Sequence, residues 1–337
     1  MTHAQINPLL VQVLSNEEVK ENIPTISSVP GKYVREMFNQ IKAINPISVV
    51  NHQTLTCTSC GRKGKYDVGM IVVNVDKKDG NMSDNIQTTG YYRCKHCNAA
   101  GNWELPQSML FQALTAALPL GDKGISLVGK NLLFDGSWHK HATDAEEYLL
   151  HLIQENPNDS YLWNRLGNIY RTGNRPELAT SAYEHSIAID PKQVESHYTL
   201  GLLLLDIKDY LNAGYHIRQS LLYAEGYKKL EAMQLREMLA IGLQSLLIIH
   251  YNSEGSVPFI PTEEERQATG RFSSSNGYDS IEIELDIDPN EISTFYPLAE
   301  MYMGIRAKEI NLRNRTYQMP STTPSKKKKV RKKKRKR

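Results

Sequence analysis

Cysteine is scarce in this 337-residue chain, which has four, and no run of 18 consecutive apolar residues occurs. So few cysteines exclude a secreted disulfide scaffold, and the lack of a long apolar run argues against a transmembrane helix. The first residues also lack the basic and apolar regions of a signal peptide. We therefore expect a soluble protein of a reducing, intracellular compartment.

Motifs of common enzymes are missing as well. The chain contains no GxSxG, GxxxxGK[ST] or HExxH sequence, and no GxGxxG follows a strand-like run. His139-Lys140-His141 lies in a segment that we interpret as an exposed turn rather than a metal or base site. We predict that the protein is not an enzyme. The alternative that stays open is an enzyme with an unrecognised site in residues 251–320.

The whole chain has no clear excess of either charge, with 40 Lys and Arg and 37 Asp and Glu. This balance holds only as an average, because the charges are unevenly distributed along the chain. Residues 326–337 contribute 11 positive charges, and without them 29 basic face 37 acidic residues, a net charge of −8. Residues 261–292 alone carry nine acids and two arginines. The chain is therefore an acidic body followed by a basic tail.

The tail cannot bury a core and its like charges repel, so we expect residues 320–337 to be disordered. Its expected partner is a polyanion, RNA, DNA or the ribosome, bound with little sequence selectivity because the tail has no aromatic residue for stacking. A solubility tail, or an intramolecular partner for the acidic residues 263–291, is the alternative. We expect a cytoplasmic protein, nuclear if the source is eukaryotic, and no membrane contact. The predicted polyanion-binding residues are Lys326, Lys327, Lys328, Lys329, Arg331, Lys332, Lys333, Lys334, Arg335, Lys336 and Arg337.

The four cysteines form two CxxC pairs, Cys57 with Cys60 and Cys94 with Cys97. A CxxC turn can place two thiolates on one ion, and zinc takes four such ligands at tetrahedral angles. The pattern resembles a four-cysteine zinc ribbon over residues 51–106. All four cysteines would then bind one structural Zn²⁺, which leaves no position for an activated water. Four unrelated buried cysteines are the alternative.

Residues rich in β-formers lie between the two pairs. Tyr66–Val75 predicts one strand, and a second run leads into Tyr91-Tyr92 after a turn-rich segment. Basic residues surround the pairs, and they either contact nucleic acid or balance the charge of a metal–thiolate centre. These residues are Arg62, Lys63, Lys65, Arg93 and Lys95.

Internal repetition is the strongest architectural signal. Residues 163–170 match W-x-x-L-G-x-x-Y, and Ala179, Tyr183 and Pro191 follow at the spacing of the A, F and P positions. A shift of 34 residues forward or back finds matching residues again: Leu200, Gly201, Ala213 and Ile217, and Ala145, Leu149 and Pro157. This pattern resembles the tetratricopeptide repeat (TPR) family, with two full repeats at about 160–227 and a preceding helix at about 143–156.

The TPR resemblance implies stacked helical hairpins whose first helices line a concave face that binds a protein or peptide partner. The family's carboxylate-binding clamp is not reproduced, because Tyr198 and Leu202 stand where its polar groups would be. The alternative is a groove that the chain itself fills. The predicted groove residues are Tyr161, Asn164, Asn168, Arg171, Glu195, Tyr198 and Leu202.

We therefore expect a mainly α fold: a TPR-type helical hairpin array with a small β zinc ribbon N-terminal to it and a small α+β segment C-terminal to it. In the connector, residues 125–134 suggest a small hairpin; in the acidic segment, residues 281–288 alternate as a strand does and 298–311 suggest a helix. The expected parts are an N-terminal helical segment (1–50), the ribbon (51–106), a helix and hairpin connector (107–139), the repeats (140–250), an acidic α+β segment (251–319) and the tail (320–337).

From these parts we predict a non-enzymatic adaptor or scaffold that binds a protein through its repeats, while the tail associates with RNA, DNA or the ribosome. The alternative is a nucleic-acid-binding or transcription-associated factor that uses the ribbon and the tail together.

Overall fold

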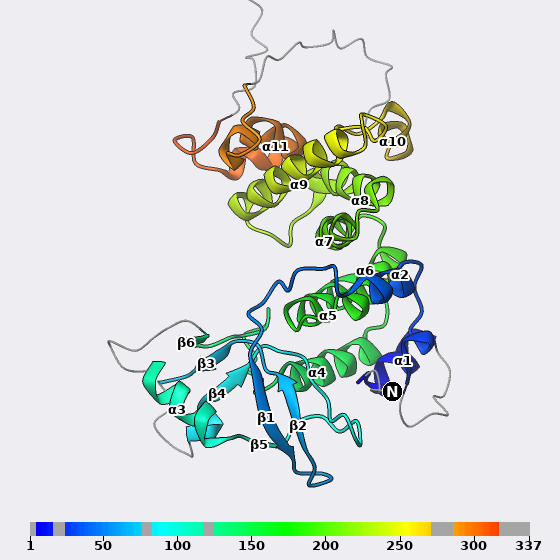
Figure 1. The fold of residues 1–337 in the computed structure, drawn as a ribbon. Coiled ribbons are helices and arrows are strands. Elements are labelled where there is room, and N and C mark those ends of the chain that lie inside the picture. The colour runs from blue at the N-terminus through cyan, green and yellow to red at the C-terminus, as the bar shows by residue number, and fades with distance from the viewer. Residues whose placement is uncertain (1–4, 16–23, 76–81, 117–124, 271–285, 317–337) are drawn as a thin grey trace, which may run out of the picture.

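The computed structural model describes residues 5–15, 24–75, 82–116, 125–270 and 286–316 (Figure 1). The expected mainly α fold is confirmed for these residues, and the strands lie before the repeats. The predicted tail and most of the predicted strand 281–288 fall outside the described residues.

The helices are α1 (Pro8–Ser15), α2 (Val34–Gln40), α3 (Gln107–Ala116), α4 (Ala142–Glu155), α5 (Ser160–Thr172), α6 (Pro176–Ile189), α7 (Val194–Asp206), α8 (Tyr210–Tyr223), α9 (Ala232–Asn252), α10 (Glu263–Ala268) and α11 (Tyr296–Met303). The strands are β1 (His52–Cys57), β2 (Lys63–Asp67), β3 (Ile71–Val73), β4 (Ile86–Thr88), β5 (Trp103–Glu104) and β6 (Ser126–Val128).

Helices α5 to α8 form two hairpins with the period seen in the sequence. The first helices, α5 and α7, begin at Ser160 and Val194, and the second helices, α6 and α8, begin at Pro176 and Tyr210. Local sequence explains these starts. The side chain of Asp159 accepts a hydrogen bond from the first turn of α5, and Pro176 stands at the start of α6, where no N–H is needed.

Small residues allow the two helices of each hairpin to pack closely. A Cβ atom on Gly167 would lie 2.5 Å from the ring of Tyr183, and one on Gly201 would lie 2.5 Å from Ile217. The glycine position of the family pattern, Gly167 in the first repeat and Gly201 in the second, is therefore one where a side chain would push the two helices apart.

Helix α9 packs against α8 and α11 and closes the helical stack (Figure 1). Among the described helices, it alone is long and apolar enough to cross a membrane, with a mean hydropathy of 1.3 over 18 residues. Because 61% of that window is buried inside the fold, α9 also meets the description of a core helix.

The strands form two three-stranded sheets, in the orders β2-β1-β5 and β4-β3-β6. The single strand predicted for Tyr66–Val75 is wrong, because β2 ends at Asp67 and β3 belongs to the other sheet. Gly69, with φ +64°, makes the break, and a Cβ there would lie 2.6 Å from the amide nitrogen of Gly90. A side chain at either glycine would obstruct this crossing.

Two further local predictions differ from the structure. The hairpin expected in residues 125–134 is wrong, because β6 pairs in parallel with β3, which lies far away in the sequence. The helix expected over residues 298–311 is shorter than predicted. It ends at Met303, where Gly304 has φ +55°, and a 3₁₀ helix follows over Gly304–Glu309.

Candidate metal centre and repeat groove

The four cysteines meet in space at one end of the β2-β1-β5 sheet. Their sulfur atoms all lie within 4.8 Å of one another, with 3.8 Å between the Sγ atoms of Cys57 and Cys97 and 3.7 Å between those of Cys60 and Cys94. These distances are well beyond the roughly 2.05 Å of a disulfide bond, and all four thiols are free.

The two cysteine turns have the same backbone design. The amide of Gly61 donates to the carbonyl of Cys57 at 2.8 Å, and the amide of Asn98 donates to that of Cys94 at 2.9 Å. Gly61 and Asn98 have φ values of +71° and +58°. Glycine and asparagine tolerate this left-handed region, which explains why they follow the second cysteine of each pair.

The thiols differ in how readily they ionise. Burial raises the pKa of the Cys94 thiol, but backbone N–H groups of Cys97 and His96 outweigh it and bring that pKa down to about 6. Burial and the neighbouring thiols raise the pKa of Cys97 to about 12. The cluster therefore cannot ionise fully on its own, and a cation at its centre would favour loss of the remaining protons.

The sulfur positions fit a tetrahedral metal ion. Metal–sulfur bonds of about 2.3 Å at tetrahedral angles require sulfur atoms about 3.8 Å apart, which matches the two measured pairs. His96 is exposed, and its Nδ1 lies 3.3 Å from a guanidinium nitrogen of Arg62. Four cysteines could thus fill the coordination shell without the histidine.

The predicted groove residues fall into two groups. Tyr161, Asn168, Arg171, Tyr198 and Leu202 are half-buried on the first helices of the two repeats. Asn164 and Glu195, however, are buried. Glu195 accepts a hydrogen bond from the hydroxyl of Tyr227, which lies beyond the second repeat, at 2.5 Å.

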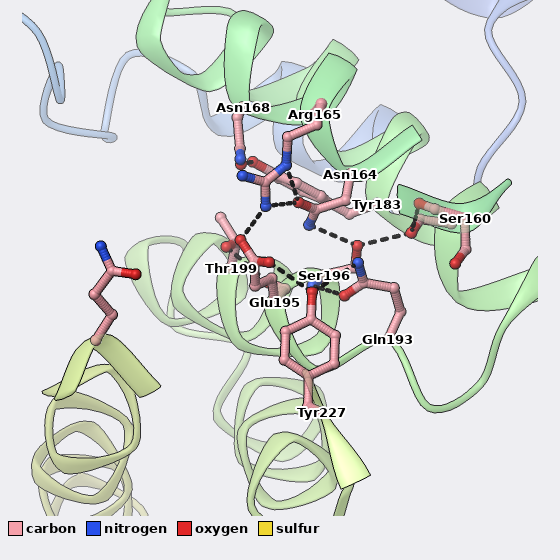
Figure 2. Close-up of polar contacts among 12 residues, drawn as sticks. Ser160, Asn164, Arg165, Asn168, Tyr183, Gln193, Glu195, Ser196, Thr199 and Tyr227 are labelled. Carbon is pink, nitrogen blue, oxygen red and sulfur yellow. Dashed lines mark hydrogen bonds and ion pairs between the residues drawn. The ribbon is translucent and has the colours of Figure 1, made fainter. Parts of the chain in front are cut away.

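These two buried residues connect the repeats (Figure 2). The amide nitrogen of Asn164 donates to Ser196 Oγ at 2.9 Å, and its oxygen accepts from Arg165. Arg165 also forms an ion pair with Glu195. The expectation that Asn164 and Glu195 face a partner is therefore corrected: their polar atoms are used between α5 and α7.

Asn168 lies beside this network and keeps one polar group free for a ligand. Its side-chain oxygen accepts a hydrogen bond from Tyr183 at 2.7 Å (Figure 2). Its amide nitrogen has no partner among the described residues. Asn168 borders a cavity of about 370 Å³, which lies between α5 and the connector that precedes α4. The residues that line this cavity include Arg165, Asn168, Ile169, Thr172, Asn131, Phe134 and His139.

The connector forms the second wall of this cavity. Gln87 holds it through two hydrogen bonds of 2.8 Å to the backbone of Asn131, and Phe134 packs edge-on against Tyr161 with 5.3 Å between ring centres. The connector therefore covers part of the face of α5 on which the groove was predicted. Local sequence gave no signal for Asn131 or His139, because an irregular segment has no periodicity that could indicate a cavity.

The histidines of the connector are not in an exposed turn. His141 is 3% exposed, and its Nδ1 lies 2.9 Å from Thr88 Oγ1 and 3.0 Å from the hydroxyl of Tyr92. Burial lowers the pKa of His141 to about 4. His139 lines the cavity, and burial lowers its pKa too. At neutral pH these imidazoles are therefore uncharged.

A buried carboxylate connects the four-cysteine region to the repeats. Glu146 on α4 is fully buried, and it accepts hydrogen bonds from the hydroxyls of Tyr91 at 2.9 Å and Tyr170 at 2.7 Å. Asn7 donates to it at 3.1 Å, and Arg93 forms an ion pair with it at 3.2 Å. Because Arg93 directly precedes Cys94, the cysteine cluster and helices α4 and α5 share this network.

Comparison with known proteins identifies the repeat region. The tetratricopeptide repeat family matches residues 160–193, which comprise α5, α6 and the turn that follows. Three similar proteins are peroxisomal targeting signal receptors. The protein of Candida glabrata is 35% identical over 69 residues, 20% of this chain and 12% of its own length. The protein of Kluyveromyces lactis is 38% identical over 61 residues, which are 18% of this chain and 11% of its own length. The protein of Saccharomyces cerevisiae is 36% identical over 55 residues, which are 16% of this chain and 9% of its own length. The chain thus matches only about a tenth of the length of these relatives.

Proposed function

We propose that this chain, which contains a tetratricopeptide repeat, is a non-enzymatic adaptor that binds a segment of a partner protein on its concave face. The observation that carries the proposal is the cavity of about 370 Å³ beside α5, with the unpaired amide nitrogen of Asn168 on its wall. The similarity to receptors of a targeting signal supports a short peptide segment as the ligand.

The groove residues would divide the work of binding. Asn168 can donate a hydrogen bond to a carbonyl or carboxylate oxygen of the segment. Arg165 is held in place by Asn164 and Glu195, so little side-chain entropy is lost when a ligand arrives. Ile169 and Phe134 offer apolar area on the wall of the cavity, and Tyr198 and Leu202, outside it, would extend that area along α7. This division gives specificity through few polar contacts and affinity through apolar burial.

In the same proposal, Cys57, Cys60, Cys94 and Cys97 hold one structural Zn²⁺. Bound zinc would cross-link the two cysteine turns of a region with short strands and little core of its own. The sulfur spacing of 3.7 and 3.8 Å and the matched turns support this role.

The basic residues 326–337 would attach the complex to RNA, DNA or the ribosome in the cytoplasm. The support for this part is the charge of the tail alone. In the second candidate function, a nucleic-acid-binding factor, the basic residues around the cysteines share the contact. Arg62, Lys63 and Lys65 are exposed, which favours that candidate.

The experiment for the groove uses cross-linking capture from native cells, with and without nuclease. The test variant is Asn168→Asp combined with Leu202→Ser, because aspartate keeps the oxygen that accepts from Tyr183 but removes the N–H donor. Asn158→Asp, in an exposed turn, is the matched control. We expect a protein captured after nuclease treatment by the wild type and the control, and lost at least about tenfold with the test variant. Equal capture by all three would contradict the groove.

Deletion of residues 326–337 separates the two candidate functions. If the tail alone binds nucleic acid, the deletion abolishes that binding and leaves protein capture intact. Substantial residual binding that depends on nucleic-acid sequence would favour the second candidate instead.

A further inference from the structure

A second cavity lies on another part of the repeats. It has a volume of about 510 Å³ and is bounded by α6, α7, α8 and residues 30–33. Its walls combine the apolar side chains of Leu14, Ile187 and Leu200 with the rings of Tyr33 and Tyr215. It shares no residue with the cavity beside α5, and its volume falls in the range of small-molecule sites.

Two buried histidines at this cavity have defined tautomers. His197 Nε2 lies 3.1 Å from the carbonyl oxygen of Pro191, which can only accept, so Nε2 carries the proton. His197 Nδ1 must then accept from His216 Nδ1, 2.9 Å away. Both imidazoles are neutral at pH 7, because burial lowers the pKa of His197 to about 4 and that of His216 to about 3.

This chain of hydrogen bonds leaves a lone pair on Nε2 of His216. The residue is 8% exposed, and that nitrogen has no hydrogen-bond partner among the described residues. Because this acceptor has no donor among the described residues, a ligand that supplies an N–H group would gain by pairing with it.

Glu184 adds a second unpaired acceptor to the same cavity. One carboxyl oxygen, Oε1, accepts from the amide of Tyr33 at 3.0 Å, whereas Oε2 is buried without a partner. Burial raises the pKa of Glu184 to about 7. The backbone amides of Tyr33 and Lys32 and the charge of Lys32 offset part of this effect of burial, and a further cation beside the carboxylate would offset more of it.

Nearby donors are already used within the protein. Ser181 Oγ donates to the carbonyl of Pro30 at 2.6 Å, and the hydroxyl of Tyr33 donates to Asn212 at 2.8 Å. The ammonium of Lys32 donates to that hydroxyl and to Asn212 as well. The donors of Ser181 and Tyr33 are therefore used within the protein, while the hydroxyl of Tyr215 and the ring of His185 in the lining have no hydrogen-bond partner among the described residues.

We propose that this cavity binds an amine or amidine with an apolar body, whose N–H groups pair with Nε2 of His216 and the carboxyl group of Glu184. The ring of Tyr215 favours a cation by the attraction of its face for positive charge, whereas the ring of Tyr33 already has the ammonium of Lys32 at 4.5 Å from its centre. The ammonium of Lys32 also lies at this cavity, so it repels any cationic ligand and repels a ligand with more than one positive charge most strongly.

Phenethylamine and 2-phenylethanol test the proposal, since the two probes have nearly the same shape and differ in the ammonium group. Their binding to the full-length chain is measured by calorimetry at pH 8, where Glu184 is ionised. We expect saturable binding of the amine at least about tenfold tighter than that of the alcohol, and a melting temperature raised by the amine.

Two variants identify the acceptors. Glu184→Gln keeps the oxygen that accepts from Tyr33 but removes the charge, and His216→Phe removes the lone pair. Each should weaken binding of the amine about tenfold and weaken binding of the alcohol much less, because the alcohol is uncharged and supplies a single donor. Because His216→Phe also unpairs His197, Glu184→Gln tests the proposal if that variant does not fold. Glu147→Gln, on the exposed side of α4, should have no effect. Equal affinity for both probes, undiminished amine binding by Glu184→Gln, or no saturable binding of the amine would overturn the proposal.

Discussion

The four-cysteine region and the helical repeats are stabilised in different ways. The strands of the first are two to six residues long, and its core is a small cluster around Leu55, Tyr66 and Trp103. The buried apolar side chains of the helices form one continuous cluster, whose members range in sequence from Ile6 to Ile310. Apolar burial can therefore hold the helices together, whereas the four-cysteine region has little core and, in the proposed function, depends on a metal ion bound by its two cysteine turns.

The largest loss of stability is expected when one of the four clustered cysteines is replaced. Cys57→Ser removes one of the four proposed metal ligands, and structural zinc contributes on the order of 10 kcal/mol to small zinc domains. We expect amides of β1, β2 and β5 to lose protection from hydrogen exchange, while α7 to α9 remain protected. Ser59→Ala, an exposed change between the same two cysteines, should have little effect. Full protection of the strands in a metal-free Cys57→Ser protein would refute the metal's structural role.

The next largest effect concerns the link between the regions. Arg93→Met leaves the carboxylate of Glu146 buried without its cation, which should cost about 3–5 kcal/mol in the free energy of unfolding. Adding Glu146→Gln should restore part of this loss, because the charge that needed compensation is gone. Urea unfolding of Arg93→Met, Glu146→Gln and the double variant gives the coupling energy. If the two losses simply add, the ion pair does not join the regions.

A smaller effect is expected within the repeats. Gly167→Ala places a Cβ 2.5 Å from the ring of Tyr183, and such overpacking should cost about 1–3 kcal/mol. Gly226→Ala is the matched control, because a Cβ there would meet no atom within 4 Å. Urea unfolding followed by the helical circular dichroism signal measures both variants. Equal stability of the two would show that close helix packing does not depend on Gly167.

The smallest effect on stability belongs to the tail. Deletion of residues 326–337 should leave the melting temperature unchanged but remove binding to RNA or DNA. A tail that contacts about six to ten phosphates should bind about a thousandfold more weakly at 200 mM than at 50 mM salt. Binding that persists without the tail and resists salt would contradict this role.

The parts that the sequence predicts best are those whose signal is local. The 34-residue period predicts α5 to α8, and the CxxC spacing predicts four cysteines at one place. Pairings between distant segments leave no such pattern. Parallel pairing of β6 with β3 and the ion pair of Arg93 with Glu146 could be found only in three dimensions.

The candidate groove shows the same limit in more detail. Asn164 and Glu195 have the helical spacing of exposed groove residues, yet they are buried. Tyr227 and Arg165 provide the reason, because both hydrogen-bond to Glu195 and cover the junction of the repeats. A helical pattern predicts which face of α5 and α7 a residue occupies, but not which neighbours bury that face.

The most direct test of the central claim is site-specific photo-cross-linking in native cells. A benzophenone side chain is placed at residue 202, one of the predicted groove positions on α7, or at residue 211, where exposed Leu211 lies on α8. The proposed adaptor predicts a discrete adduct with a protein partner from residue 202, resistant to nuclease, and none with that partner from residue 211. No adduct from residue 202, or the same adduct from both positions, would contradict a partner site in the repeat groove.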